Sequence, residues 1–149
     1  RLRLGGRAST RVPGELDGAP AAFYGHDPFT RAFIEALFWT ESDKDDIPAD
    51  AGYADLSSSA LDAIRADCAR FQKENEPYLA QAYARPGYDE ARAGHDFWLT
   101  RNGHGTGFWD RDELDAGDLG AKLASFCGFG TDFDQMDAYM GDDGKVHVS

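Results

Sequence analysis

Cysteine and long apolar runs are scarce in this chain of 149 residues. Its two cysteines, Cys68 and Cys127, are too few for a disulfide framework, and without histidines close by in sequence they do not suggest a structural zinc site. No apolar run is long enough to span a bilayer, and no segment has the pattern of a secretory signal peptide. These absences exclude small disulfide-stabilised domains, zinc-finger domains and helical membrane proteins.

Basic residues are also in short supply, which leaves a strongly acidic protein. Fifteen Lys and Arg stand against 27 Asp and Glu, for a net charge of -12. Residues 1–25 hold four arginines and two acids, a surplus of two positive charges, so the remaining chain carries -14. Because binding to DNA, RNA or anionic lipid depends on Lys and Arg, such a body is expected to repel all three and to attract basic protein surfaces.

The chain is predicted to form one globular domain preceded by an arm. Residues 1–25 are interrupted by Gly and Pro and have little to bury, so we expect a flexible basic arm. An upstream extension, a processing remnant and an added leader all remain open for it, and its arginines could make weak, salt-sensitive contacts with nucleic acid. Apolar residues make up 42% of the chain, enough for residues 26–149 to form a single acidic domain with its own core.

Apolar periodicity and capping residues predict two helices in the first half of the domain. The first should begin at Asp27-Pro28, because Asp caps helices and Pro fits their first position, and should run to about Trp39. A polar, acidic loop follows over residues 41–56. The second helix should begin at Ser57 or Ser58 and should kink or restart at Pro77.

Two further helices are expected in the second half. One should start near Tyr88-Asp89 and stop at Asn102-Gly103, since both of those last residues tolerate a left-handed backbone. Its apolar side is predicted to carry Ala91, His95, Trp98 and Leu99. The other should cover about residues 117–126.

Near the end of the chain, Asp143-Gly144 lies between short apolar-containing runs and predicts a β-hairpin, with Met140 opposite His147. A segment around Thr106–Trp109 could add a third strand. We therefore expect an α+β fold, with three to four packed helices and a small antiparallel sheet that includes this hairpin. The predicted core consists of Phe29, Phe33, Leu37, Leu61, Ile64, Phe71, Leu79, Trp98, Leu99, Leu123 and Phe126.

The segment 94–111, GHDFWLTRNGHGTGFWDR, concentrates Trp, His and Gly. One interpretation is a tightly packed corner in which glycines serve the backbone, aromatic rings join the core, and arginines pair with acids such as Asp96 and Asp110. The other interpretation is a partner- or ligand-binding site with His104 at its tip. The packed corner is favoured, because glycine spacing by itself is a weak signal. The candidate binding residues are Arg101, Asn102, His104, Trp109, Asp110 and Arg111.

The run AGHDFWLTRNGHGTGFWDRD, with FQKENEPYLAQAY before it and GDDGKVHV after it, resembles a group of small acidic proteins encoded by bacteriophages and prophages. The resemblance covers about residues 27–149 and leaves the basic arm outside. It implies a phage or prophage gene acting in the bacterial host cytoplasm or carried in a virion. It implies no catalytic role for any residue.

Three hypotheses for function follow, the first of which we prefer. A non-enzymatic accessory protein would bind a bacterial or phage protein, in one version by mimicking nucleic acid and occupying a basic nucleic-acid-binding surface. The acidic candidates for such mimicry are Glu41, Asp43, Asp45, Asp46, Asp50 and Asp55, together with Asp110, Asp112, Glu113, Asp115 and Asp118. The second hypothesis is a virion-associated structural or assembly protein.

The third hypothesis is a metal-assisted hydrolase built on the dipeptides His26-Asp27 and His95-Asp96. A metal site needs three or four convergent ligands, so His104 or Asp110 would have to complete it. Adjacent helix residues point about 100° apart, which prevents all of these groups from facing one ion. We therefore expect no bound metal, no cofactor and no contact with membranes.

Overall fold

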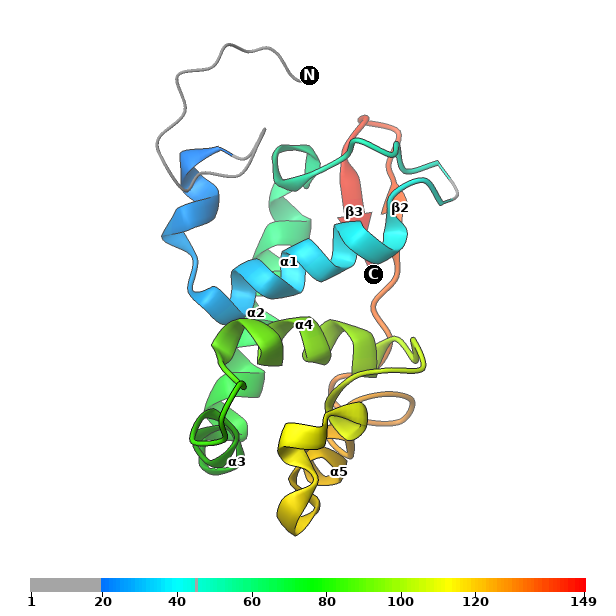
Figure 1. The fold of residues 1–149 in the computed structure, drawn as a ribbon. Helices are drawn as coiled ribbons and strands as arrows, with labels where there is room; N and C mark the ends of the chain where they lie inside the picture. The colour runs from blue at the N-terminus through cyan, green and yellow to red at the C-terminus, as the bar shows by residue number, and fades with distance from the viewer. Residues whose placement is uncertain (1–19, 45) are drawn as a thin grey trace.

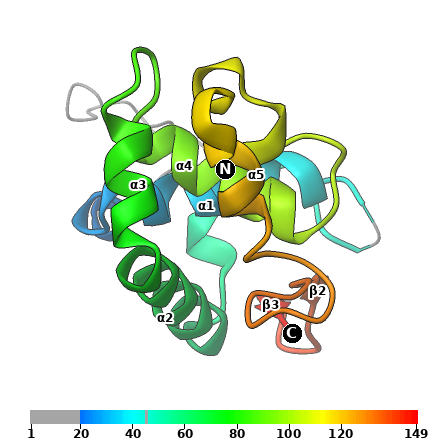
Figure 2. The ribbon, with the colours of Figure 1, turned by 90° about the horizontal axis from the view of Figure 1, so that it is seen from below.

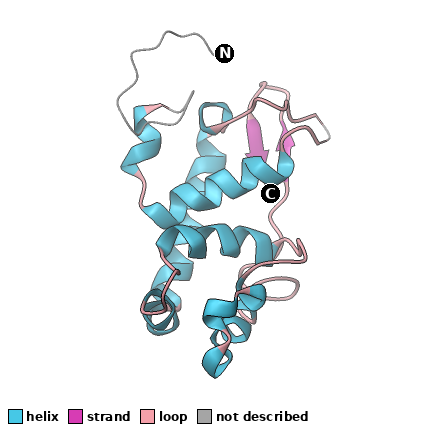
Figure 3. Ribbon diagram, in the orientation of Figure 1, coloured by secondary structure: helices cyan, strands magenta, loops and turns pink. Residues whose placement is uncertain are grey.

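The computed structural model describes residues 20–44 and 46–149. Figure 3 shows that helices make up most of the described chain and that strands are confined to a hairpin near the C-terminus. The fold is α+β, as predicted. Its regular elements are α1 (Pro28–Glu41), α2 (Ser58–Glu74), α3 (Glu76–Tyr83), α4 (Glu90–Arg101), α5 (Leu119–Ala124), β2 (Ala138–Met140) and β3 (Val146–Val148).

The predicted capping residues begin the long helices. Asp27 Oδ1 accepts a hydrogen bond from the backbone N–H of Thr30 at 2.6 Å, and Pro28 occupies the first position of α1. Ser57 Oγ accepts from the N–H of Ala60 at 3.0 Å and caps α2. Both starting points are confirmed, and α1 extends two residues past the expected end at Trp39.

The second predicted helix is divided into α2 and α3 at Asn75. This residue is buried, and its side-chain amide donates to the carbonyl of Phe71 at 3.1 Å, which ends α2. Pro77 then lies in the first turn of α3, where a missing backbone N–H costs nothing. The expected restart is confirmed, and it raises the count of α-helices in the described residues from the expected three or four to five.

Helices α1 and α4 form the centre of the molecule and lie side by side in Figure 1. Gly94 permits this approach, since a Cβ at this position would collide with the carbonyl oxygen of Phe29 on α1. The buried side of α4 differs from the prediction. Ala91 is exposed and His95 is only half-buried, whereas Phe97 has no exposed surface.

The predicted buried side of α4 was wrong because neighbouring elements cover this helix on two sides. One side packs on α1, and another faces an aromatic cluster in which the rings of Phe71 and Phe97 stack at 4.2 Å. Phe29, Phe108 and Phe133 surround this pair, with ring centroids 5.2 to 6.0 Å away. Most of the predicted core is buried as expected. Leu61 and Phe126 only pack against it from its edge.

The hairpin is present, but its register differs by one residue from the prediction. Met140 pairs with Val146, and Tyr139 pairs with His147. A three-residue loop, closed by a hydrogen bond from Gly141 N–H to the Lys145 carbonyl at 2.8 Å, replaces the expected two-residue turn. Gly144 has φ of 77°, the left-handed residue that this longer loop requires.

The sheet contains two strands among the described residues, so the expected third strand around Thr106–Trp109 is wrong. That segment forms a 3-10 turn over Phe108–Asp110 instead, and further turns follow at Asp112–Leu114 and Ala116–Asp118. The hairpin instead contacts the start of α2, where the N–H of Ser57 donates a hydrogen bond to the carbonyl of Val146 at 2.9 Å. The hairpin therefore covers the N-terminal end of α2.

The predicted boundary of the basic arm at residue 25 is too late. Ala21–Gly25 forms a 3-10 turn, and Phe23 is 3% exposed and contacts Tyr53 edge to face at 5.4 Å. The burial of Phe23 attaches this segment to the domain, which the sequence prediction did not foresee. The four arginines of the expected arm lie among residues 1–19, outside the described part of the chain.

The two acidic stretches lie far apart. The loop after α1 is at the end of the molecule that carries the hairpin, while residues 110–118 lie beside α5 at the opposite end (Figure 1). The view from below separates them as well (Figure 2). The two acidic stretches therefore do not adjoin each other in the fold.

Candidate functional site

Two of the six candidate binding residues, Arg101 and Asn102, form hydrogen bonds within the protein. Arg101 is 5% exposed; its guanidinium donates to Asp67 Oδ2 at 2.9 Å and to the carbonyl of Asp134 at 2.8 Å. Asn102 Oδ1 accepts from the N–H of Met136 at 2.9 Å. Both side chains fasten the C-terminal segment to the end of α4.

The next three candidates lie on the surface but are not brought together as one site. The ring Nε2 of His104 lies 3.8 Å from Glu41 Oε2 and not beside Asp110. Asp110 accepts a hydrogen bond from the hydroxyl of Thr106 at 2.9 Å. Trp109 is 51% exposed, whereas its neighbour Phe108 is completely buried.

The sixth candidate, Arg111, reaches back to α4. Its Nε donates to both carboxylate oxygens of Asp96, at 2.9 and 3.1 Å, as the packed-corner interpretation expected. The hydroxyl of Tyr88 donates to the same carboxylate at 2.8 Å. Burial raises the pKa of Tyr88, and the negative charge of Asp96 raises it further, so the phenol stays protonated as a donor.

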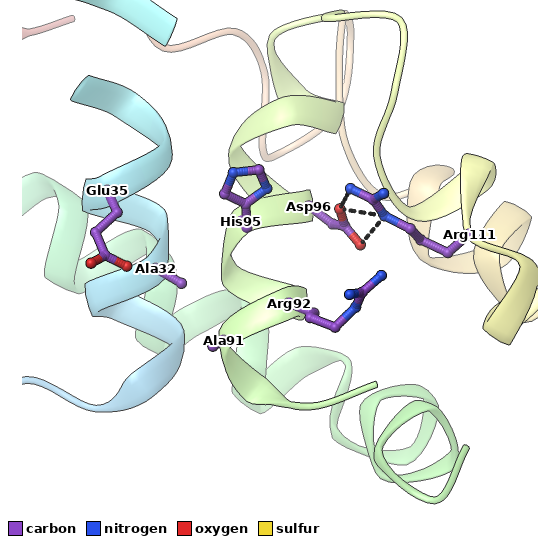
Figure 4. A pocket seen from close by; sticks show the side chains of 7 residues that line it. All are labelled: Ala32, Glu35, Ala91, Arg92, His95, Asp96 and Arg111. Carbon is purple, nitrogen blue, oxygen red and sulfur yellow. Dashed lines mark hydrogen bonds and ion pairs between the residues drawn. The ribbon is translucent and has the colours of Figure 1, made fainter. Parts of the chain in front are cut away.

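Arg111 and Asp96 border an open groove between α1 and α4, with a volume of about 360 Å³ (Figure 4). The small side chains of Ala32 and Ala91 leave it open. A second hollow of about 300 Å³ shares Ala32, Ala91 and Glu35 and continues along α1 toward its N-terminus. The first hollow is lined by Ala32, Glu35, Ala91, Arg92, His95, Asp96 and Arg111.

Some of the charged residues that line the groove have an ion-pair partner, and one does not. Arg92 pairs with Glu113 at 2.9 Å, and Arg111 pairs with Asp96. No ion pair joins Glu35 to a Lys, Arg or His in the described part of the chain. Figure 4 shows Glu35 on α1, across from the α4 residues. Loss of hydration raises the pKa of Glu35, an effect that the charge of Arg31 opposes.

An exposed tryptophan contacts His95, one of the residues that line this groove. The ring of Trp39, on the last turn of α1, lies 5.5 Å from the ring of His95 at an angle of 38°. Trp39 is nevertheless 72% exposed, in contrast to Trp98, which is buried. Burial lowers the pKa of His95 below 6.5, and Asp96 opposes that shift. The imidazole is therefore neutral at pH 7.

The sequence did not identify Glu35 and Trp39 as candidate site residues. Both lie off the apolar stripe of Phe29, Phe33 and Leu37 that the helix periodicity identified. A tryptophan outside the apolar stripe of its own helix was the available signal. The contact between Trp39 and His95 depends on how α1 packs on α4, which the sequence does not reveal.

The His-Asp dipeptides have other roles. His26 Nε2 lies 2.8 Å from the hydroxyl of Tyr53, Asp27 caps α1, and His95-Asp96 is divided between Trp39 and Arg111. Across residues 20–44 and 46–149, no three His, Cys, Asp or Glu side chains converge to hold a metal ion. The dipeptides therefore lie outside any three-ligand cluster in this part of the chain.

Neither Cys68 nor Cys127 forms a disulfide. Burial raises the pKa of Cys68 and raises the pKa of Cys127 to about 12. Since the thiolate is the reactive form, neither is an activated nucleophile.

Comparison of the chain with protein-family models, with curated proteins and with solved structures gives no match. In the described residues, none of the helices combines the length and apolar character needed to cross a bilayer.

Proposed function

We propose that this protein is a non-enzymatic accessory factor that acts by binding a basic surface of another protein. The observation that carries the proposal is Trp39, a 72% exposed tryptophan in contact with His95, which lines a groove together with the unpaired carboxylate of Glu35. Tryptophan is the residue type most enriched among the energetic anchors of protein interfaces. The charge of -14 outside residues 1–25 favours a basic partner.

A compact contact anchored by Trp39 is favoured over extended mimicry of a nucleic acid. Mimicry by both acidic stretches together would need them on one surface, and they lie at opposite ends of the molecule (Figure 1). The acidic surplus would then act mainly on encounter, by steering a basic partner toward the groove, and the aromatic contact would slow dissociation.

The resemblance to phage-encoded proteins supports placing this activity in the cytoplasm of a bacterial host, with a bacterial or phage protein as the partner. Association with the virion is the alternative location. Mass spectrometry of purified virions distinguishes the two, because a cytoplasmic factor would be absent from them.

Affinity capture with the full chain tests the proposed function. The immobilised protein is incubated with nuclease-treated bacterial lysate, and bound proteins are eluted by steps of salt and identified. We expect a basic protein that elutes at moderate salt, and we expect Trp39→Ala to weaken its affinity by roughly thirtyfold, the effect of losing an anchor worth about 2 kcal/mol. Phe129→Ala is the control, because it removes a 98% exposed ring remote in sequence from the groove.

Recovery of no basic protein at low salt would contradict the proposal. Capture that survives Trp39→Ala unchanged would place the contact elsewhere and remove the observation on which the proposal depends.

A further inference from the structure

Glu35 differs from the other carboxylates that line or flank the groove. Asp96 binds Arg111, and Glu113 binds Arg92, so the two guanidiniums next to the groove already have anionic partners. The guanidinium of Arg31, one helical turn before Glu35, donates instead to the carbonyl oxygens of Tyr24 and His26 at 3.2 and 3.0 Å. Glu35 therefore lines the groove without an ion pair, although the charge of Arg31 acts on it from one helical turn away.

An exposed aromatic ring lies one helical turn from Glu35. Glu35 and Trp39 are four residues apart on α1, a spacing that puts two side chains next to each other on one helix face. Both are exposed, and both adjoin His95, which lines the groove with Glu35 and contacts the ring of Trp39. A carboxylate beside an aromatic face attracts a cation through both groups at once.

We propose that Glu35 and Trp39 together receive an arginine side chain of the basic partner. This inference rests on the proposed function and names the chemistry of the contact. The guanidinium N–H groups would donate to the carboxylate of Glu35 while the planar cation lies on the exposed face of the Trp39 indole. Arginine fits better than lysine, because the guanidinium is planar, weakly hydrated and able to stack, whereas the ammonium group is a strongly hydrated point charge.

His95 would act as a positioning residue in this contact. Its ring lines the groove and lies 5.5 Å from the indole of Trp39, so it would keep the indole close to Glu35. Since its pKa is lowered by burial, the ring carries no positive charge at pH 7 that would repel the incoming guanidinium.

The test uses three peptides of equal length in which glycine alternates with arginine, lysine or citrulline. Each is titrated into the 15N-labelled full chain at 0.15 M salt, and the indole N–H resonance of Trp39 is assigned with Trp39→Phe. We expect the arginine peptide to shift this resonance saturably, with the indole of buried Trp98 unaffected. The lysine peptide should bind several-fold more weakly, and the uncharged citrulline peptide should produce no saturable shift.

Variants on and off the site complete the test. Glu35→Gln and Trp39→Ala should each weaken binding of the arginine peptide roughly fivefold, as expected for an exposed cation–π or ion-pair contact. Glu76→Gln removes the same charge from α3, and Phe129→Ala removes an exposed ring, so both controls should stay within about twofold of the wild type. All four side chains are exposed, and circular dichroism verifies that the variants are folded.

Equal binding of the arginine and lysine peptides, or wild-type affinity in Glu35→Gln and Trp39→Ala, would overturn the inference. The captured partner separates this failure from failure of the proposed function. A partner that both variants still bind normally leaves the proposed function standing and removes the arginine site. Specific peptide binding at Trp39, with no basic protein captured, supports the arginine site and contradicts the proposed function.

Discussion

Arg111 donates hydrogen bonds to the carboxylate of Asp96 from both its Nε and its Nη2, and Asp96 has no exposed surface. The pair joins the turn after the glycine-rich segment to the middle of α4, and the hydroxyl of Tyr88 supplies a third donor to the same carboxylate. This buried contact fixes one wall of the groove between α1 and α4.

Replacing Asp96 by Asn should therefore destabilise the fold strongly. Removing one partner of a buried ion pair typically costs about 3–5 kcal/mol, and a value near the lower end is expected because Arg111 retains some access to water. Urea unfolding measures the change. Asp110→Asn, a nearby exposed carboxylate, should change the free energy of unfolding by less than about 0.5 kcal/mol.

A double variant distinguishes two causes of lower stability, an unpaired buried charge and the loss of hydrogen bonds. Asp96→Leu combined with Arg111→Met should cost less than Asp96→Asn, since no unpaired charge remains. A double variant less stable than the single one would show that the hydrogen bonds themselves, including that of Tyr88, dominate.

Protonation of His95 should destabilise the protein. Its pKa lies below 6.5 mainly because of burial; the nearby charges of Arg111 and Arg92 lower it further, and Asp96 opposes them. The folded state thus binds this proton more weakly than the unfolded state, so stability should fall as pH drops through 6.5 and level off below the folded pKa. Burial shifts the pKa of His26 in the same direction. Urea unfolding between pH 8 and pH 5 measures the slope, and His95→Gln should reduce it.

The same histidine reports on Trp39. If the indole helps to exclude water from His95, Trp39→Ala should raise the pKa of His95 toward 6.5, as followed by NMR titration of its ring protons. An unchanged pKa would mean that α1 and α4 by themselves account for the desolvation.

Gly94→Ala should destabilise the protein although it lies inside a helix. Alanine normally favours a helix by about 1 kcal/mol over glycine. Here the new methyl group would collide with the carbonyl oxygen of Phe29 and push α4 away from α1, at a cost of about 1–3 kcal/mol or more. Gly52→Ala is the control, because a Cβ there meets no atom within 4 Å. A higher melting temperature for Gly94→Ala would show that the two helices separate easily.

Asn102→Ala should loosen the C-terminal segment locally. The variant removes the acceptor for the N–H of Met136 and the donor to the carbonyl of Trp98. Hydrogen exchange at the Met136 amide should accelerate about tenfold, in line with a lost contact of 1–1.5 kcal/mol, while amides within α1 keep their rates. Uniform acceleration throughout the domain would indicate instead that this contact supports global stability.

Local signals explain how much of the fold could be predicted. Asp27, Ser57 and Asp89 cap their helices through hydrogen bonds to residues three positions later, a relation contained within one turn of sequence. The same is true of the helix break before Pro77. The hairpin was also recognisable, but its register depended on whether the loop had two or three residues, and Gly144 is compatible with either.

The candidate site was harder to predict because its residues come from separate elements. The segment rich in Trp, His and Gly was noticeable, yet Arg101, Asn102 and Arg111 turned inward to bind Asp67, Met136 and Asp96. A sequence pattern identifies residues capable of binding and does not tell whether their partner is internal or external.

The sequence by itself determined the α+β class, the helix starts and the acidic charge, because these depend on neighbours within a few residues and on composition. Only the tertiary structure decided that Phe97 joins the core and that Trp39 remains outside it beside His95. Burial of a side chain depends on which other elements cover it. In this protein Phe97 packs against Phe33 of α1, Phe71 of α2 and Phe133, whereas Trp39 keeps 72% of its surface exposed.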